Sequence, residues 1–250
     1  MRSFITWIGG KNFLKKEICS RIPEGCKRYI EVFGGAAWVL FNKSPHEMEV
    51  YNDANGDLVN LFKCVKYHRP ELQRELSCML NSRELFEDFK AQCYIKGMTD
   101  IQRAARFFML IKSSYGADVR SFGCVKRDIN VAIQYFERIE ERLTKVVIEH
   151  KDFEDLIKVY DKPEAIFYLD PPYYGTERYY QAQFSQDDHY RLLNRLQGIK
   201  GKFILSYNDC EFIRELYKDF NISSVDRNHN LKNRYEDAEH NYRELLIQNY

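Results

Sequence analysis

Residues Ala165–Leu169 constrain the fold of this chain more than any other segment. All five are apolar or aromatic. A short apolar run of this kind is typical of a strand that is buried on both faces, as strands in parallel sheets are. The run therefore predicts an α/β protein in which a central parallel strand is covered by helices on both sides.

Alternating strand and helix patterns on either side of this run support the same fold class. Further strands are predicted at 29–33, 47–51, 145–149, 202–206, 221–225 and 244–248. Helices are predicted at 11–21, 36–42, 56–67, 152–159, 185–196 and 211–217. Ser185 and Asp188 resemble a capping box that opens one of these helices.

The middle of the chain differs from both ends. Residues 71–142 have helical periodicity and no strong strand pattern, with helices expected at 101–111 and 131–143. The stretch 112–130 between them has glycines at Gly116 and Gly123, which indicates a loop or a hairpin. A helical insertion of roughly 80–90 residues is far longer than an ordinary connection, so we expect it to have a function of its own.

Composition excludes several classes of protein. The chain has 250 residues, of which 44% are hydrophobic and 30% are charged, as in globular rather than disordered proteins. No apolar run approaches the ~20 residues of a membrane span, and the N-terminus lacks the pattern of a secretion signal. The seven cysteines form no Cys-x-x-Cys pair, so we expect reduced thiols and a cytoplasmic location.

Asp170-Pro171-Pro172-Tyr173 directly follows the apolar strand, where ligand sites of open α/β sheets lie. The two prolines remove backbone donors, so the segment offers acceptors, namely the Asp170 carboxylate and the Pro171 carbonyl. Two acceptors beside an aromatic ring suit a planar group that carries an NH2. The alternative is a plain turn that ends the strand, because Asp-Pro and Pro-Pro are common in turns.

Small residues follow the first predicted strand, in the segment Glu-Val-Phe-Gly-Gly-Ala-Ala at 31–37. They would let a ligand approach the backbone, although the segment is not the Gly-x-Gly-x-x-Gly pattern of dinucleotide enzymes. Asp53 ends the next strand about twenty residues later, where a carboxylate can accept both hydroxyl hydrogens of a ribose. The alternative for Asp53 is the N-cap of the helix that starts near Gly56.

The segment Trp7-Ile8-Gly9-Gly10-Lys11 precedes the first predicted helix. Glycines there leave the N-terminal amides of the helix accessible, and Lys11 adds positive charge, so a carboxylate or phosphate could bind. An ordinary helix start is the alternative. The histidines His150, His189 and His229 share no metal spacing with each other or with a cysteine, so no metal site is expected.

Taken in order, Trp-x-Gly-Gly-Lys, Phe-Gly-Gly-Ala, Asn-Asp and Asp-Pro-Pro-Tyr resemble the motifs of the Dam-type (alpha-class) DNA adenine-N6 methyltransferases. The resemblance spans nearly the whole chain, including the closing segment 244–250. It implies a Rossmann-like methyltransferase sheet with S-adenosylmethionine as cofactor and no metal. It further implies a catalytic domain formed by 1–57 and 144–250, with an inserted, mainly helical target-recognition domain at 58–143.

The resemblance also implies roles for individual residues. The residues expected at the cofactor are Trp7, Gly10, Lys11, Phe33, Gly35, Asp53, Asp152, Phe153 and Asp170. Asp170, Pro171, Pro172 and Tyr173 would hold the target base. Ala37 departs from the family, which usually has a second glycine there, and its methyl group is expected to tighten the cofactor turn.

A local basic patch lies within the insertion, although the net charge of the chain is only +1. Residues 100–127 contain six basic side chains against two acidic ones. By resemblance to the family's base-contacting hairpin, the expected DNA contacts are Ser113, Tyr115, Arg120, Ser121, Lys126 and Arg127. Arg120 would contact a base edge, and Lys126 and Arg127 would contact phosphates. A solvated helix face is the alternative for Arg103 and Arg106.

The expected reaction is methyl transfer to the N6 amine of an adenine flipped out of a specific double-stranded DNA site. The expected partners are DNA and, in a restriction-modification setting, a cognate restriction endonuclease; the expected setting is a prokaryotic or phage-infected cell. Two alternatives stay open, namely an amino-methyltransferase for RNA or cytosine-N4 and a catalytically idle DNA-binding module. Residues outside the motifs that could face DNA or a flipped base are Tyr179, Tyr180, Phe184 and the loop 227–234.

Overall fold

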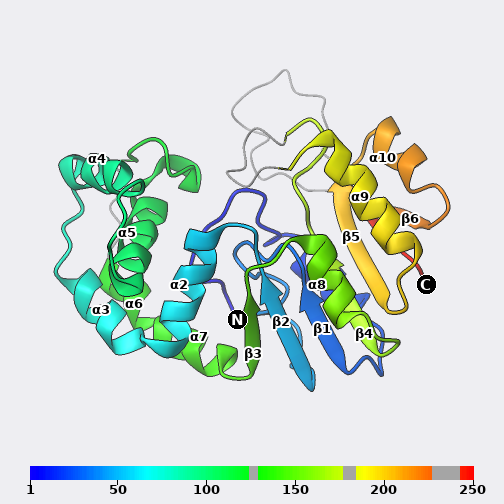
Figure 1. Ribbon diagram of the computed structural model, residues 1–250, viewed down its shortest axis with the longest axis horizontal. Helices are drawn as coiled ribbons and strands as arrows, with labels where there is room; N and C mark the ends of the chain where they lie inside the picture. Colours follow the sequence, from blue (N-terminus) through cyan, green and yellow to red (C-terminus); the bar gives the residue numbers. More distant parts are fainter. Residues whose placement is uncertain (124–128, 177–183, 227–242) are drawn as a thin grey trace.

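The computed structural model describes residues 1–123, 129–176, 184–226 and 243–250, and these form a seven-stranded sheet flanked by helices (Figure 1). The strand order is β3-β2-β1-β4-β5-β7-β6. The strands are β1 (Arg28–Glu31), β2 (Met48–Asn52), β3 (Val146–Glu149), β4 (Ala165–Leu169), β5 (Lys202–Asn208), β6 (Asn221–Asp226) and β7 (Arg243–Gln248). The first five strands in this order, β3, β2, β1, β4 and β5, are parallel to one another. Strand β7 pairs antiparallel with both β5 and β6.

The central position of β4 confirms the prediction from its composition. It has the predicted bounds, all five of its residues are buried, and it pairs with β1 on one side and β5 on the other. Alternate residues enter two separate hydrophobic clusters, with Ile166 and Tyr168 on one face and Phe167 and Leu169 on the other. A strand between two parallel neighbours has no solvated face, which explains why it carries no polar residue.

Helices cover both faces of the sheet. One face carries α8 (Phe153–Tyr160), α9 (Gln186–Gln197) and α10 (Glu211–Leu216), seen in front of the sheet in Figure 1. The other face packs against α1 (Lys15–Ser20), α2 (Gly56–Tyr67) and the helices that follow α2. The predicted capping box is present at the start of α9, where the Asp188 carboxylate accepts the Ser185 N–H at 2.7 Å.

The segment between β2 and β3 is mainly helical, as predicted, and lies at one side of the sheet (Figure 1). Its helices are α2, α3 (Arg69–Ser77), α4 (Arg83–Gln92), α5 (Asp100–Ser113), α6 (Ile129–Gln134) and α7 (Phe136–Leu143). Helix α5 packs against α2, α3 and α4, and its buried residues belong to the same hydrophobic cluster as Tyr29 and Tyr51 of the sheet. The helices therefore share a continuous core with one face of the sheet.

Three predicted helices differ in the structure. The helix expected at 11–21 is shorter, since α1 begins at Lys15 and residues 12–14 form a turn. The helix expected at 36–42 is wrong, because these residues form successive turns. Ala37 there has φ +55°, a left-handed conformation that interrupts a right-handed helix and favours glycine. The helix expected at 131–143 is divided into α6 and α7 at Tyr135.

The hairpin expected within 112–130 is present where the structure describes it. Ser114 and Phe122 form an antiparallel bridge, and the Gly123 N–H donates to the Ser113 carbonyl at 2.7 Å. The short 3-10 helix η1 (Tyr115–Ala117) lies near the tip. Separately, none of the described helices has both the length and the apolar composition needed to cross a membrane.

Candidate active site

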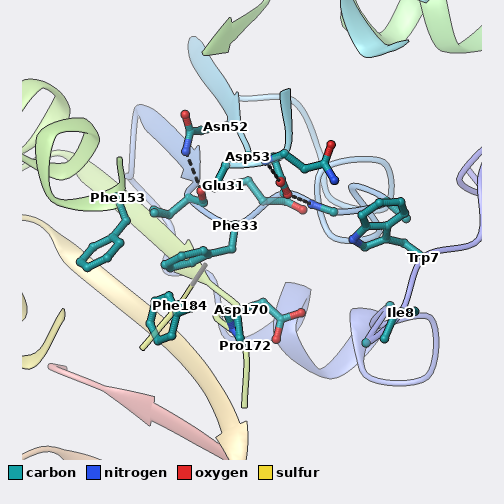
Figure 2. A pocket seen from close by; sticks show the side chains of 18 of the residues that line it. Trp7, Ile8, Glu31, Phe33, Asn52, Asp53, Phe153, Asp170, Pro172 and Phe184 are labelled. Carbon is teal, nitrogen blue, oxygen red and sulfur yellow. Dashed lines mark hydrogen bonds between the residues drawn. The ribbon is translucent and has the colours of Figure 1, made fainter. Parts of the chain in front are cut away.

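A cavity of about 710 Å³ opens at the carboxyl ends of β1, β2 and β4 (Figure 2). This is the edge at which open α/β sheets bind ligands. The volume lies within the range of small-molecule and cofactor sites, about 300–1,000 Å³. The lining residues are 7–11, 31–36, 38–39, 52–55, 117–119, 151–153, 168, 170, 172, 184–185, 188 and 191.

The cavity brings together most of the predicted catalytic and cofactor residues. These are Trp7, Gly10, Lys11, Phe33, Gly35, Asp53, Asp152, Phe153, Asp170 and Pro172. Pro171 and Tyr173 do not line the cavity; Pro171 is buried and Tyr173 is half-buried. Segments that are distant in the sequence thus converge because the parallel strands end at one edge of the sheet.

Asp53 is held at the end of β2 by backbone donors. Its Oδ2 accepts the Gly35 N–H at 2.8 Å and its Oδ1 accepts the Asn55 N–H at 2.8 Å. Burial raises the pKa of Asp53, and these two hydrogen bonds oppose that shift. The alternative role of Asp53 as a helix N-cap is wrong, since the side chain of Asn55 caps α2 by accepting from Asp57 and Leu58.

The turn between β1 and the cavity requires small residues. A Cβ atom on Gly34 would lie 2.2 Å from the ring of Tyr51, so a larger residue would displace this buried tyrosine. Gly35 has φ +49° and its backbone lies beside Trp7. The two glycines therefore allow the Phe33 side chain and the turn to approach the cavity closely.

Three phenylalanine rings gather at one end of the cavity in Figure 2. The centroids of Phe33 and Phe153 are 5.7 Å apart, and Phe184 lies 5.9 Å from each. Asp152 lies next to them, capping α8 through the Glu154 N–H and pairing with Arg191 at 3.0 Å. This end of the cavity suits a flat aromatic ligand with polar groups at its rim.

Asp170 lies opposite Asp53 across the cavity in Figure 2. Its Oδ1 is 2.7 Å from the Lys11 ammonium and accepts the Ser206 hydroxyl at 2.8 Å. Within the described part of the chain, no donor contacts Oδ2. Burial raises the pKa of Asp170, while the nearby Lys11 ammonium lowers it.

Tyr173 is oriented by Glu244, a residue that the sequence motifs did not single out. Its hydroxyl donates to the Glu244 carboxylate at 2.6 Å, and its ring lies 4.6 Å from the Lys11 ammonium. Glu244 is buried and its Oε2 is 3.8 Å from Lys11 Nζ. A carboxylate at the head of an apolar strand was the available signal, but its partner could not be identified from the sequence.

Glu31 begins the segment 31–37, and the sequence pattern indicates no role for its side chain. It lines the cavity at the end of β1, and its Oε2 accepts from the Tyr29 hydroxyl at 2.7 Å and the Leu40 N–H at 2.9 Å. Burial raises the pKa of Glu31 to about 8, although its two hydrogen bonds and the Lys43 ammonium oppose this shift.

The hairpin contributes to the cavity as well as to the surface, which the sequence did not predict. Ala117, Asp118 and Val119 line the cavity. The Asp118 carboxylate accepts the backbone N–H groups of Arg120 and Ser121, at 2.9 Å and 3.1 Å, and this fixes the tip.

The expected DNA contacts lie in different environments. Tyr115, Arg120 and Ser121 are exposed on the hairpin, whereas Ser113 is buried at the end of α5. Lys126, Arg127, Tyr179, Tyr180 and the loop 227–234 lie outside the described residues. Phe184 joins the aromatic cluster of the cavity. The described residues hold no group of three His, Cys, Asp or Glu side chains suited to a metal ion.

Comparison with known proteins matches residues 7–231 to the family described as D12 class N6 adenine-specific DNA methyltransferase. Type II methyltransferase M1.LlaDCHI of Lactococcus lactis subsp. cremoris is 28% identical, over 90% of this chain and 88% of that protein. Type II methyltransferase M.MjaIII of Methanocaldococcus jannaschii is 28% identical, over 100% of this chain and 99% of that protein. The DNA adenine methylase of Escherichia coli K12 is 25% identical, over 87% of this chain and 84% of that protein. The family match includes the whole cavity wall and the hairpin.

Proposed function

The chain belongs to the D12 class of N6 adenine-specific DNA methyltransferases, and from this premise we propose how its cavity and hairpin carry out the reaction. The enzyme methylates the N6 amine of adenine in DNA, with S-adenosylmethionine as methyl donor. This activity replaces the alternatives of RNA and cytosine-N4 as substrates. A catalytically idle module remains the alternative that the experiment below tests.

The donor chemistry of the cavity fits S-adenosylmethionine, which when bound supplies an electrophilic methyl group on a sulfonium centre. Asp53 accepts a single hydrogen bond on each oxygen, so both oxygens keep lone pairs for the ribose hydroxyls. The rings of Phe33, Phe153 and Phe184 provide an apolar surface for the adenine ring of the cofactor. Trp7 and Gly10 border the opposite end.

The target amine is held by the acceptors of the 170–173 segment. In this proposal Asp170 Oδ2 and the Pro171 carbonyl each accept one amine hydrogen, which leaves the nitrogen lone pair less delocalised. Of these two residues only Asp170 lines the cavity, so the Pro171 carbonyl rests on the motif alone. Tyr173 stacks on the flipped base from its position beside the wall. Flipping costs a few kcal/mol, and the chain contributes to the transfer through positioning and electrostatics.

The observation that carries this proposal is the state of Asp170. It is a largely buried carboxylate on the cavity wall with both of its protein donors on Oδ1. Among the described residues no donor contacts Oδ2, so this oxygen is available to a ligand in the cavity. A turn that merely ended β4 would not need a buried lysine and a buried serine to hold its carboxylate.

The insertion at 58–143 serves as the target-recognition part in this proposal. The exposed side of the hairpin, with Tyr115, Arg120 and Ser121, contacts a specific double-stranded DNA site. Its inner side, 117–119, faces the cavity. One side of the hairpin would thus recognise the DNA sequence, and the other side would help to position the flipped base.

A restriction endonuclease with the same site is proposed as a second partner in the cell. The support is that two relatives carry the name type II methyltransferase. DNA from a host that expresses the chain should then resist cleavage by an endonuclease that cuts at the methylated site. Complete cleavage at fully methylated sites would contradict this part of the proposal.

The test is expression of the chain in a host without adenine methylation, followed by sequencing of methylated adenines. We expect N6-methyladenine at one short sequence for the native chain and for Asp155→Ala, an exposed carboxylate on α8. We expect none for Asp170→Ala. Absence of methylated adenine with the native chain would favour the idle DNA-binding module.

A further inference from the structure

The segment 170–173 is held by side chains of β5, the direct neighbour of β4, and of β7 beyond it. Ser206 on β5 is fully buried, and its hydroxyl donates to Asp170 Oδ1 at 2.8 Å. Lys11 contacts the same oxygen at 2.7 Å. Two donors that converge on one oxygen prevent the carboxylate from rotating, because rotation would break both interactions.

Glu244 at the start of β7 fixes the neighbouring aromatic ring. Its carboxylate accepts the hydroxyl hydrogen of Tyr173 at 2.6 Å, a short distance for an O–H···O⁻ hydrogen bond. The Glu244 side chain is only 4% exposed. Because the hydroxyl is at the far end of the ring, this bond restricts both torsions of the tyrosine side chain.

Ser206 and Glu244 come from adjacent antiparallel strands. Ser206 pairs with Leu246 in the register of β5 and β7, and Glu244 pairs with Asn208. The two side chains therefore lie on a rigid part of the sheet, whereas the segment that they hold is a loop. A site held from ordered strands keeps its geometry better than one held by loops.

We propose, resting on the proposed function, that Ser206 and Glu244 are positioning residues of methyl transfer: Ser206 aims Asp170 Oδ2 at the target amine, and Glu244 fixes the Tyr173 ring against which the base stacks. Neither residue touches the substrate. Their contribution is to pre-organise the acceptor and the ring, and a displacement of about 1 Å at a reacting centre can cost as much as 100-fold in rate.

The first test replaces the serine hydroxyl. Ser206→Ala should lower kcat about tenfold, the loss that corresponds to one hydrogen bond. The KM for DNA and the Kd for S-adenosylmethionine should stay unchanged. The control is Ser223→Ala, because Ser223 on β6 pairs with the same Leu246 from the other side of β7. Equal kcat values for the two variants would overturn the role of Ser206.

The second test uses the tyrosine–carboxylate pair. Glu244→Ala should lower kcat, and Glu244→Gln, which keeps an acceptor oxygen, should restore much of it. In a Tyr173→Phe background, Glu244→Ala should cause little further loss, because its effect acts through the tyrosine hydroxyl. Multiplicative losses in the double variant would overturn the role of Glu244. Melting temperatures identify any variant whose fold is damaged. If Glu244→Ala is such a variant, the kcat of Glu244→Gln relative to the native enzyme tests the role of Glu244 instead.

A matched control lies elsewhere on the same sheet. Tyr160 donates to Glu149 of β3 at 2.7 Å, and neither residue lines the cavity. Glu149→Ala and Tyr160→Phe should leave kcat unchanged.

A duplex with 2-aminopurine at the target position adds a direct signal, since Glu244→Ala should weaken stacking of the flipped base and raise its fluorescence. Unchanged fluorescence would contradict the proposal.

The two levels of proposal fail in different ways. If the native chain methylates no DNA, the proposed function is overturned, and the positioning roles with it. If the native chain is active and Ser206→Ala and Glu244→Ala match their controls, only the positioning roles are overturned.

Discussion

Two carboxylates face the same cavity from opposite sides of β1, and they are held in different ways. Asp53, at the end of β2, accepts from two backbone N–H groups. Asp170, at the end of β4, is held by the side chains of Lys11 and Ser206. Burial raises the pKa of both. The comparison shows that one carboxylate is positioned by the main chain of a turn and the other by side chains that are distant in the sequence.

The difference fits the two proposed roles, ribose binding for Asp53 and amine binding for Asp170. A ribose diol needs an acceptor at a fixed place, and neutral backbone donors leave the carboxylate charge available to both hydroxyls. A target amine becomes positively charged as it attacks, so the carboxylate beside it must be aimed at that atom and kept ionised. Burial raises the pKa of Asp170, and the Lys11 ammonium opposes this shift and so favours the ionised form.

The largest effect is expected at Asp170. Asp170→Asn keeps the size of the side chain but presents an amide that can donate as well as accept. Methyl transfer should fall by about 10²–10³-fold, the loss typical of removing one preorganised electrostatic contact. The measurement is single-turnover transfer of labelled methyl groups to DNA. A rate close to that of the native enzyme would show that Asp170 is not the amine acceptor.

Asp53 should affect cofactor binding and leave DNA binding intact. Asp53→Ala should weaken S-adenosylmethionine by about 1–3 kcal/mol, because ribose hydroxyls lose their acceptor. Calorimetry measures that loss, and a gel shift should show unchanged DNA affinity. If cofactor affinity stays the same, the role of Asp53 is limited to holding the turn at Gly35.

Arg120 should change the choice of site without affecting either carboxylate. Arg120→Ala should lose about 1–3 kcal/mol of discrimination at one base pair, since arginine can bond bidentately to guanine. The measurement is methylation rate on duplexes with single substitutions. Arg138→Ala, an exposed arginine of α7, is the control. Equal losses on every duplex would make Arg120 a phosphate contact.

Glu31 lies between the two carboxylates, and changing it should have the smallest effect on the reaction. Its expected role is in the pH dependence of the free energy of unfolding. Its folded pKa of about 8 exceeds its ordinary value of 4.5. Between these values the folded protein retains a proton that the unfolded chain releases, so the free energy of unfolding falls as pH rises. Above pH 8 this fall ends, since both states are ionised.

Melting temperatures of the ligand-free protein from pH 5 to pH 9 test the role of Glu31. The melting temperature of the native protein should fall across this range, by about 2–4 °C for each kcal/mol lost from the free energy of unfolding. Glu31→Gln cannot titrate, so its melting temperature should fall less. Parallel curves for the two proteins would assign the pH dependence to other groups.

Much of the fold could be predicted from local patterns. Helix α2 and strand β4 have the predicted bounds, and every other predicted strand is present within a few residues. Where local reasoning was wrong, tertiary contacts explain it. Residues 36–42 contain good helix formers, yet the Leu40 N–H donates to the buried Glu31 carboxylate and Ala37 turns into the left-handed region. Contacts across the turn outweighed helix propensity.

The site could be predicted only in part. Motifs at strand ends identified Asp53, Asp170 and the glycine turn, because the ends of parallel strands meet at one edge. The partners of these residues were not predictable in the same way. Ser206 and Glu244 lie 36 and 71 residues from the side chains they contact, and no periodic pattern relates residues at such separations.

The sequence by itself determined the α/β class, the helical character of the segment between β2 and β3, the family and the Asp-Pro-Pro-Tyr motif after β4, since each depends on residue types within a short window. Only the tertiary structure decided that Lys11 and Ser206 share one oxygen of Asp170, that Glu244 holds Tyr173, and that the hairpin reaches the cavity wall. The physical reason is that these contacts join segments brought together by sheet order and core packing, which depend on the whole chain at once.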